Sequence, residues 1–237
     1  FRSAGTFIAV SSRLGYYSRV PRSFTSELPL IAVCRQRGTK AGDPIVFQTT
    51  QGDIAGRYHS VAGGLATRAV VWLSGSGGGF EGPAHGLYAA LALELQIMGI
   101  ESLRLEYRRS TRQDECVRDA LVGAHWLTRE RGIERLALVG HAFGSAVAIT
   151  AGAASEEVSA VAALASPTVD AVARLGKPLF LGHGADDQVQ PAAGCLRLEQ
   201  RAAGDVTCRI YPGAQHNLDE CRDALSADLV GWLDDQL

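Results

Sequence analysis

Several features that would assign this sequence of 237 residues to a class are missing from it. No stretch approaches the ~20 consecutive apolar residues that a membrane-spanning helix needs. The five cysteines are odd in number and widely spaced, and no two of them form a CxxC pair. A disulfide framework and a zinc site are therefore not expected, and reduced thiols of the cytoplasmic type are the default.

Acidic side chains are almost absent from residues 1–40, which carry seven basic side chains and only Glu27. The rest of the chain holds 16 basic and 24 acidic side chains, a net charge near −8. This acidic part of the chain repels phosphates, and nucleic acid is therefore not expected as a partner. The Arg- and Ser-rich segment 1–43 has the composition of an organellar transit segment, although a disordered extension or a fragment end has the same composition. Without import, we expect a cytoplasmic protein.

From residue 44 onward, strand-like and helix-like segments alternate without an internal repeat, which indicates one domain over 44–237. A glycine turn near Gly52 predicts an antiparallel hairpin. The following βα alternation predicts an α/β fold: a mostly parallel, eight-stranded sheet with helices on both faces. Only about a dozen residues separate the strand ending near Ala165 from the one at Pro178, so no cap domain is expected. The expected strands are 44–50, 54–59, 69–73, 102–107, 136–139, 158–164, 178–181 and 207–211, and the expected helices are 83–98, 113–131, 144–151 and 219–236.

The segment Gly140-His141-Ala142-Phe143-Gly144 lies between an apolar strand and a helix of small residues. A strand, a tight turn and a helix are the setting of the G-x-S-x-G nucleophile elbow. Its two glycines are needed because side chains there would clash with the neighbouring strand and helix. The sharp turn presents the central side chain to the cleft, and in this sequence that side chain is the methyl group of Ala142.

Two further segments follow the strands 178–181 and 207–211. The run from His183 to Asp187 resembles an H-G-x-x-D segment, and residues 211–216 resemble a loop that carries a catalytic base. With the elbow, these segments resemble the α/β-hydrolase superfamily, in particular its small, capless, dienelactone-hydrolase-like and esterase-like members. The resemblance implies that Ala142 occupies the nucleophile position, that Asp187 is the acid with Asp186 as the fallback, and that His216 is the base. The other histidines are expected to be structural.

The resemblance also implies an oxyanion hole. Its donors would be the backbone N–H of Phe143 and that of Ser76 or Gly77, in the glycine-rich loop 74–79. A plain flexible loop is the alternative, and the His-Gly usual in the family is Ser74-Gly75 here. No G-K-[ST] follows the glycines, which excludes a Walker loop. We expect neither a cofactor nor a metal.

A methyl group at the nucleophile position cannot attack a carbonyl carbon. Ser145 lies one turn into the helix and cannot replace the nucleophile unless the elbow is remodelled. Three hypotheses remain: a carboxylic-ester hydrolase relative disabled by design or by natural loss, a ligand-binding pseudohydrolase, and an Asp187–His216 dyad enzyme that forms no covalent intermediate. In each, we expect a small ester-type ligand that is reached from solvent. We expect Trp126 and Trp232 either in the core or at the contact of a homodimer.

Overall fold

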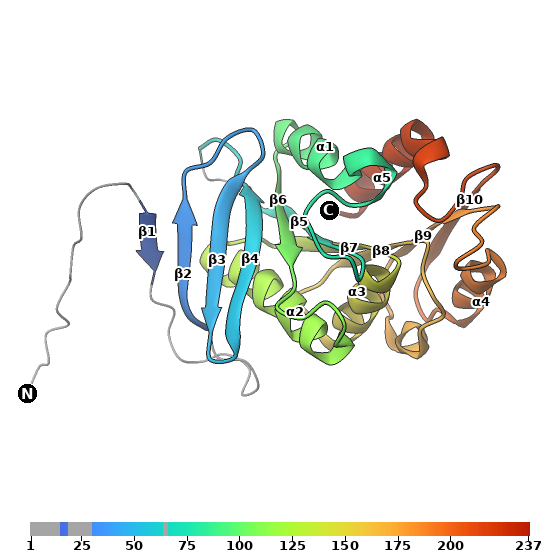
Figure 1. Cartoon of the computed structure of the whole chain (residues 1–237), viewed down its shortest axis with the longest axis horizontal. Coiled ribbons are helices and arrows are strands. Elements are labelled where there is room, and N and C mark those ends of the chain that lie inside the picture. Colours follow the sequence, from blue (N-terminus) through green and yellow to red (C-terminus); the bar gives the residue numbers. More distant parts are fainter. Residues whose placement is uncertain (1–14, 19–29, 64–65) are drawn as a thin grey trace, which may run out of the picture.

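The computed structural model describes residues 15–18, 30–63 and 66–237 of the chain. The described strands form one sheet of ten strands in the order β1-β2-β3-β4-β6-β5-β7-β8-β9-β10 (Figure 1). They are β1 (Gly15–Ser18), β2 (Leu30–Gln36), β3 (Asp43–Thr49), β4 (Gly52–His59), β5 (Arg68–Leu73), β6 (Ile100–Glu106), β7 (Arg135–His141), β8 (Ala160–Leu164), β9 (Leu179–Gly184) and β10 (Val206–Tyr211).

The sheet has an antiparallel part and a parallel part. Strands β1 to β4 pair antiparallel in sequence order, and β4 pairs antiparallel with β6. The remaining strands, from β6 through β5 and β7 to β10, run parallel. The predicted hairpin is confirmed in β3 and β4, and the mostly parallel α/β architecture is confirmed with it.

The sheet contains ten strands rather than the expected eight, because β1 and β2 lie within the segment 1–43. Strand β2 adds to the antiparallel edge by pairing with β3, and it buries Val33 to 3% exposure. The Arg35 guanidinium forms an ion pair with Asp43 of β3. These contacts join residues from two strands, and the sheet thus begins before residue 44, earlier than the sequence analysis placed it.

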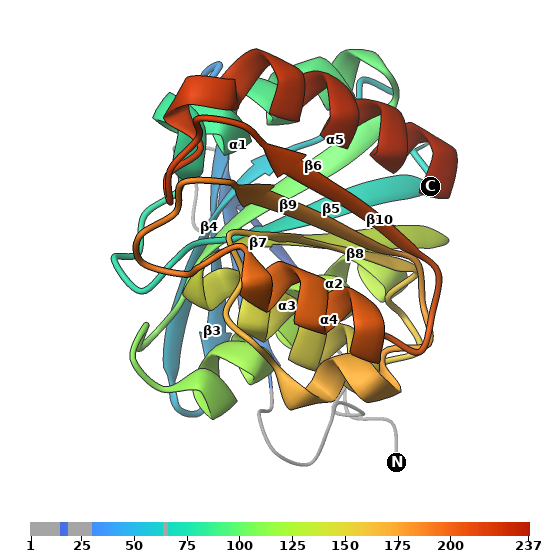
Figure 2. The same ribbon diagram turned by 90° about the vertical axis from the view of Figure 1, so that its right-hand side faces the viewer.

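Helices cover both faces of the sheet, as predicted (Figure 2). On one face α1 and α5 pack on side chains such as Trp72 and Phe180, and on the other face α2, α3 and α4 pack on side chains such as Val71 and Leu181. Both Trp126 and Trp232 are buried in these cores, at 5% and 8% exposure. The helices are α1 (Pro83–Ile97), α2 (Gln113–Glu130), α3 (Phe143–Ala154), α4 (Ala193–Arg201) and α5 (Arg222–Gln236), with short 3₁₀ helices at Asp170–Arg174 and Asp219–Cys221.

The connection from β8 to β9 holds only the 3₁₀ helix Asp170–Arg174, so no cap domain is inserted there. The helix α4 forms the connection between β9 and β10, for which the sequence predicts no particular structure. Among the described residues, no helix has both the length and the apolar character needed to cross a membrane.

Candidate active site

The turn between β7 and α3 is held in a strained conformation. Ala142 has φ 51° and ψ −116°, a left-handed backbone that residues with a Cβ rarely adopt. A Cβ on Gly140 would lie 2.1 Å from the carbonyl oxygen of Gly144, and a Cβ on Gly144 would lie 2.4 Å from the carbonyl oxygens of Leu73 and Ser74. Both glycines are therefore required by close backbone approach, as the elbow pattern predicts.

Asp187 and His216 come from different loops and meet beside this turn. Asp187 lies in the loop between β9 and α4, and His216 follows β10. The Nδ1–H of His216 donates to Oδ2 of Asp187 at 2.8 Å. The Asp187 side chain is fully buried, whereas that of His216 is 20% exposed. The neighbouring Asp186 is exposed, so the structure places Asp187 rather than the fallback beside His216.

Three hydrogen bonds hold the Asp187 carboxylate. Its Oδ1 accepts the backbone N–H groups of Val189 and Gln190, both at 2.8 Å. Its Oδ2 accepts from His216 and lies 3.3 Å from Nε2 of His183, whose N–H donates to the carbonyl of Gln190. Burial raises the pKa of Asp187, but the bonds from Gln190, His216 and Val189 outweigh it and hold the pKa below its usual value. The carboxylate is thus charged at neutral pH and orients His216.

His141 contacts the loop that carries His216. Its Nε2 donates to the backbone carbonyl of His216 at 2.9 Å, and the two rings lie 5.1 Å apart. Burial lowers the pKa of His141 to about 4, so the ring is neutral near pH 7. A neutral ring with its proton on Nε2 can donate this bond without placing a second positive charge beside His216. His141 therefore positions the His216 loop.

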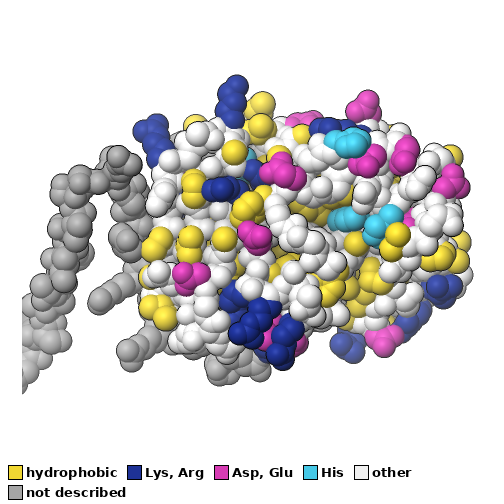
Figure 3. Space-filling model, viewed as in Figure 1, with side chains coloured by type: hydrophobic (Ala, Val, Ile, Leu, Met, Phe, Trp, Pro, Cys, Tyr) yellow, Lys and Arg dark blue, Asp and Glu magenta, His cyan; other side chains and the backbone are white. Residues whose placement is uncertain are grey.

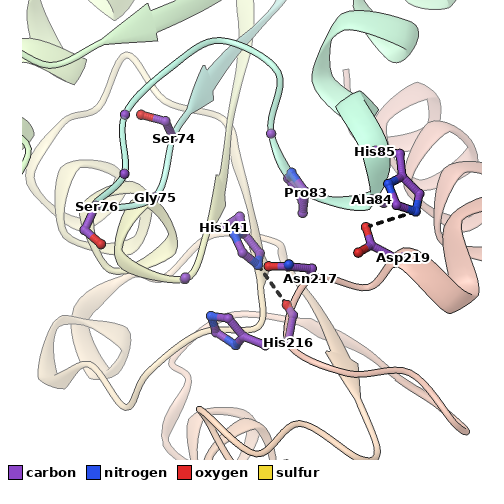
Figure 4. A pocket seen from close by; sticks show the side chains of 14 residues that line it. Ser74, Gly75, Ser76, Pro83, Ala84, His85, His141, His216, Asn217 and Asp219 are labelled. Atoms are coloured by element: carbon purple, nitrogen blue, oxygen red, sulfur yellow. Dashed lines mark hydrogen bonds and ion pairs between the residues drawn. The ribbon is translucent and has the colours of Figure 1, made fainter.

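A cavity of about 450 Å³ opens between the turn and these loops. Figure 4 shows its walls, which come from the loop after β5, the start of α1 and the loop after β10. Histidine side chains are visible on the face of the molecule shown in Figure 3, and His85, His141 and His216 line the cavity. The residues that line the cavity are Ser74, Gly75, Ser76, Gly77, Gly78, Gly82, Pro83, Ala84, His85, His141, Ala142, His216, Asn217 and Asp219.

The structure brings most of the predicted site residues together at this cavity. Ala142 and His216 line it together with Ser76 and Gly77. Phe143 begins α3, directly after Ala142, and its ring packs edge-on against Tyr107 at 6.2 Å. Its side chain is therefore turned toward the core, and Phe143 is not among the residues that line the cavity.

Ser145, the serine nearest to the turn in the sequence, does not line the cavity. Ser145 is fully buried, and its hydroxyl donates to the backbone carbonyl of Ala142 within the first turn of α3. That hydrogen bond stabilises the beginning of the helix rather than aiming an oxygen at a ligand.

The start of α1 departs from the regular helix that its sequence predicts. Ala84, His85 and Gly86 all have left-handed φ values, of 51°, 53° and 88°. The turn is tied to the loop after β10, because the Ala84 N–H donates to the carbonyl of Asn217 at 2.9 Å. It places His85 on the cavity wall, with Nε2 3.7 Å from Oδ1 of Asp219. The sequence analysis treated His85 as structural, and the flanking glycines of Gly82–Gly86 were the only signal of an irregular turn.

Metal-binding side chains do not cluster at this cavity. Within residues 15–18, 30–63 and 66–237, no group of three or more His, Cys, Asp or Glu side chains is placed to hold a metal ion. The groups that line the cavity include the imidazole of His216, which Asp187 orients, and the hydroxyl groups of Ser74 and Ser76.

The strand order, the strained turn and the carboxylate–imidazole pair define an α/β-hydrolase fold. The sequence pattern of the dienelactone hydrolase family matches residues 100–228, more than half of the chain. The chain belongs to the dienelactone hydrolase family. A comparison with curated proteins finds no match.

Solved structures agree with this fold. The chain is similar to Est1E from Butyrivibrio proteoclasticus, with 12% identity and a TM-score of 0.71 over 81% of this chain and 98% of that one. It is also similar to a dienelactone hydrolase from Anabaena variabilis, with 20% identity and a TM-score of 0.68 over 82% and 99% of the two chains. A Pyrococcus furiosus esterase has 15% identity and a TM-score of 0.68, over 81% and 90%.

Proposed function

We propose that this chain binds a small ester-type molecule at an ester-hydrolase site that lacks its nucleophile. The observation that carries the proposal is the Asp187–His216 hydrogen bond of 2.8 Å beside a strained turn whose central residue is Ala142. The pair is oriented as a serine hydrolase requires, but the atom that it would activate is missing. Acyl transfer through a covalent intermediate is therefore not available to the unaltered chain.

The oxyanion donors that we propose are the backbone N–H of Phe143 and that of Ser76 or Gly77. Phe143 is the first residue of α3, where N–H groups have no partner within the helix and the helix dipole is positive. Ser76 and Gly77 line the cavity from the loop after β5. Each such donor is worth about 3 kcal/mol toward a developing oxyanion.

Size and charge favour a small-molecule ligand. The cavity holds about 450 Å³ and has no cap domain above it, which suits a compact ester reached from solvent. The acidic body disfavours nucleic acid, and the five free thiols suit a cytoplasmic protein. Among the similar structures, Est1E is described with ferulic acid bound, and we propose an ester of comparable size for this chain. We treat residues 44–237 as the hydrolase domain, with β2 added to its edge.

Restoring the nucleophile tests this proposal. Ala142→Ser places a hydroxyl at the turn without changing the backbone, and we expect hydrolysis of nitrophenyl acetate or butyrate to rise at least about 10³-fold. The double variant Ala142→Ser/His216→Ala should lose the gain, because the serine then has no base. A serine variant that folds normally yet hydrolyses no faster than the parent would refute the assignment of Ala142 to the nucleophile position.

A second candidate function is water activation by the dyad alone. It is favoured by the partial exposure of His216, which is 20% accessible while its Asp187 partner is buried. The methyl group of Ala142 leaves room where a serine oxygen would stand, so a water molecule beside His216 could be deprotonated directly. Turnover by the unaltered chain that disappears in His216→Ala would favour this candidate over a purely binding role.

A further inference from the structure

Two cysteines outside the cavity lie within reach of each other. Cys195 is in the first turn of α4 and Cys208 is in the middle of β10. Their sulfur atoms are 3.5 Å apart, so they need to approach by only about 1.5 Å to form a disulfide of ordinary length. Both are free thiols, and the separation of 13 positions along the chain shows that the fold brings them together.

The two thiols differ in environment. Cys195 is a buried residue of α4, at 1% exposure, whereas Cys208 is half-buried on the last strand of the sheet. The hydrogen bond between them raises the pKa of Cys195 and lowers that of Cys208, and the nearby Arg209 lowers the pKa of Cys208 further. Cys208 is therefore the thiol that an oxidant reaches first and the better nucleophile of the two.

We propose that Cys195 and Cys208 form a redox-responsive pair, which closes a disulfide between α4 and β10 when a hydroperoxide oxidises Cys208. The Cys208 thiolate attacks one oxygen of hydrogen peroxide, so that an S–O bond forms, the O–O bond breaks and hydroxide leaves. Cys195 then attacks the sulfenic sulfur, the S–S bond forms and the second oxygen leaves as water. In total, two thiols and one hydrogen peroxide give one disulfide and two water molecules.

The position of the pair links this chemistry to the cavity. Helix α4 directly follows the loop that carries Asp187, and β10 directly precedes the loop that carries His216. A disulfide between the two elements would hold these loops at a fixed spacing. The inference does not depend on the ligand or reaction proposed for the cavity, because it concerns thiols that do not line it.

The test is oxidation of the full-length, reduced protein with a small excess of hydrogen peroxide. We expect the thiol count under denaturing conditions to fall from five to three, and peptide mass analysis to identify a Cys195–Cys208 link. The melting temperature should rise by roughly 5–10 °C, because the link closes a short loop in the unfolded chain, and dithiothreitol should reverse the rise. Hydrogen exchange should slow in residues 185–192 and 212–217 of the oxidised protein.

Matched variants separate this pair from general thiol oxidation. Cys208→Ser and Cys195→Ala should each abolish the disulfide and the rise in melting temperature, while Cys34→Ser, which removes another half-buried thiol, should retain both. Thiol loss without the Cys195–Cys208 link, or a rise in melting temperature that persists in Cys208→Ser, would overturn the proposal. Unchanged exchange in both loops of the cross-linked protein would overturn its connection to the cavity.

Discussion

Asp187→Asn is the substitution that isolates what the carboxylate does for His216. In the native site Oδ1 accepts two backbone N–H groups at 2.8 Å, and Oδ2 accepts the Nδ1–H of His216 at 2.8 Å. The single amide oxygen of asparagine will take the place of Oδ1, because two backbone N–H groups donate to that position. The amide NH₂ then faces Nδ1 of His216, which must give up its proton and move it to Nε2.

The expected size of the effect follows from the bonds lost. The variant loses the charge-assisted bond to His216 and keeps the two backbone bonds, so we expect a destabilisation of about 2 kcal/mol. For a chain of this length, that corresponds to a fall in melting temperature of roughly 4–8 °C. The pKa of Asp187 lies below its usual value, so its contribution is present above the unfolded pKa, near 4, and is lost as the pH falls through the folded pKa. The difference in stability between parent and variant should therefore shrink below about pH 4.

Two measurements check this reasoning. Nitrogen-15 NMR of the imidazoles reports which nitrogen of His216 carries the proton, and urea unfolding at several pH values gives the difference in free energy of unfolding. Asp186→Asn is the matched control, since Asp186 is exposed and should change neither quantity. A Nδ1 proton that stays on His216 in Asp187→Asn, or a stability difference that does not depend on pH, would refute the role assigned to the carboxylate.

Two further predictions concern stability. Gly140→Ala should destabilise the protein by about 3 kcal/mol in urea unfolding, because its Cβ would lie 2.1 Å from a carbonyl oxygen, whereas Gly231→Ala in α5, where a Cβ meets nothing within 4 Å, should be neutral or slightly stabilising. Arg131→Met should cost about 3–5 kcal/mol, because Glu101 is buried at 1% exposure and loses its ion pair with Arg131 at 3.2 Å. Adding Glu101→Gln to Arg131→Met should recover part of that loss, and full additivity of the two changes would contradict the buried-charge explanation.

Much of the parallel sheet and the main site residues could be predicted from the sequence because their signals are local. Short apolar runs such as 136–139 mark strands buried on both faces, and Asp187 and His216 each follow such a strand. Gly140 is also required locally, because a Cβ there would meet the backbone of Gly144, whereas Gly144 is required by the distant carbonyl oxygens of Leu73 and Ser74.

Other features depend on partners distant in the sequence and could not be predicted. Strand β2 lies in a basic segment and is ordered by its pairing with β3, including the Arg35–Asp43 ion pair. The left-handed turn at Ala84 and His85 opposes the preference of both residues for helix. It is held by the carbonyl of Asn217, which accepts from Ala84, and by Arg222, which donates to the carbonyl of His85 at 3.1 Å. Both partners lie more than 130 residues away in the chain, so the sequence around residue 84 does not indicate them.

The elbow keeps its shape without a hydroxyl group, and this has an evolutionary consequence. Its conformation is fixed by close backbone contacts at Gly140 and Gly144, while Ala142 has a positive φ that costs roughly 1–3 kcal/mol. Codons for alanine and serine differ by one base. A single nucleotide change at position 142 would therefore place a hydroxyl group on a backbone that is already in place, so under the proposed function the nucleophile can be gained or lost without rebuilding the fold.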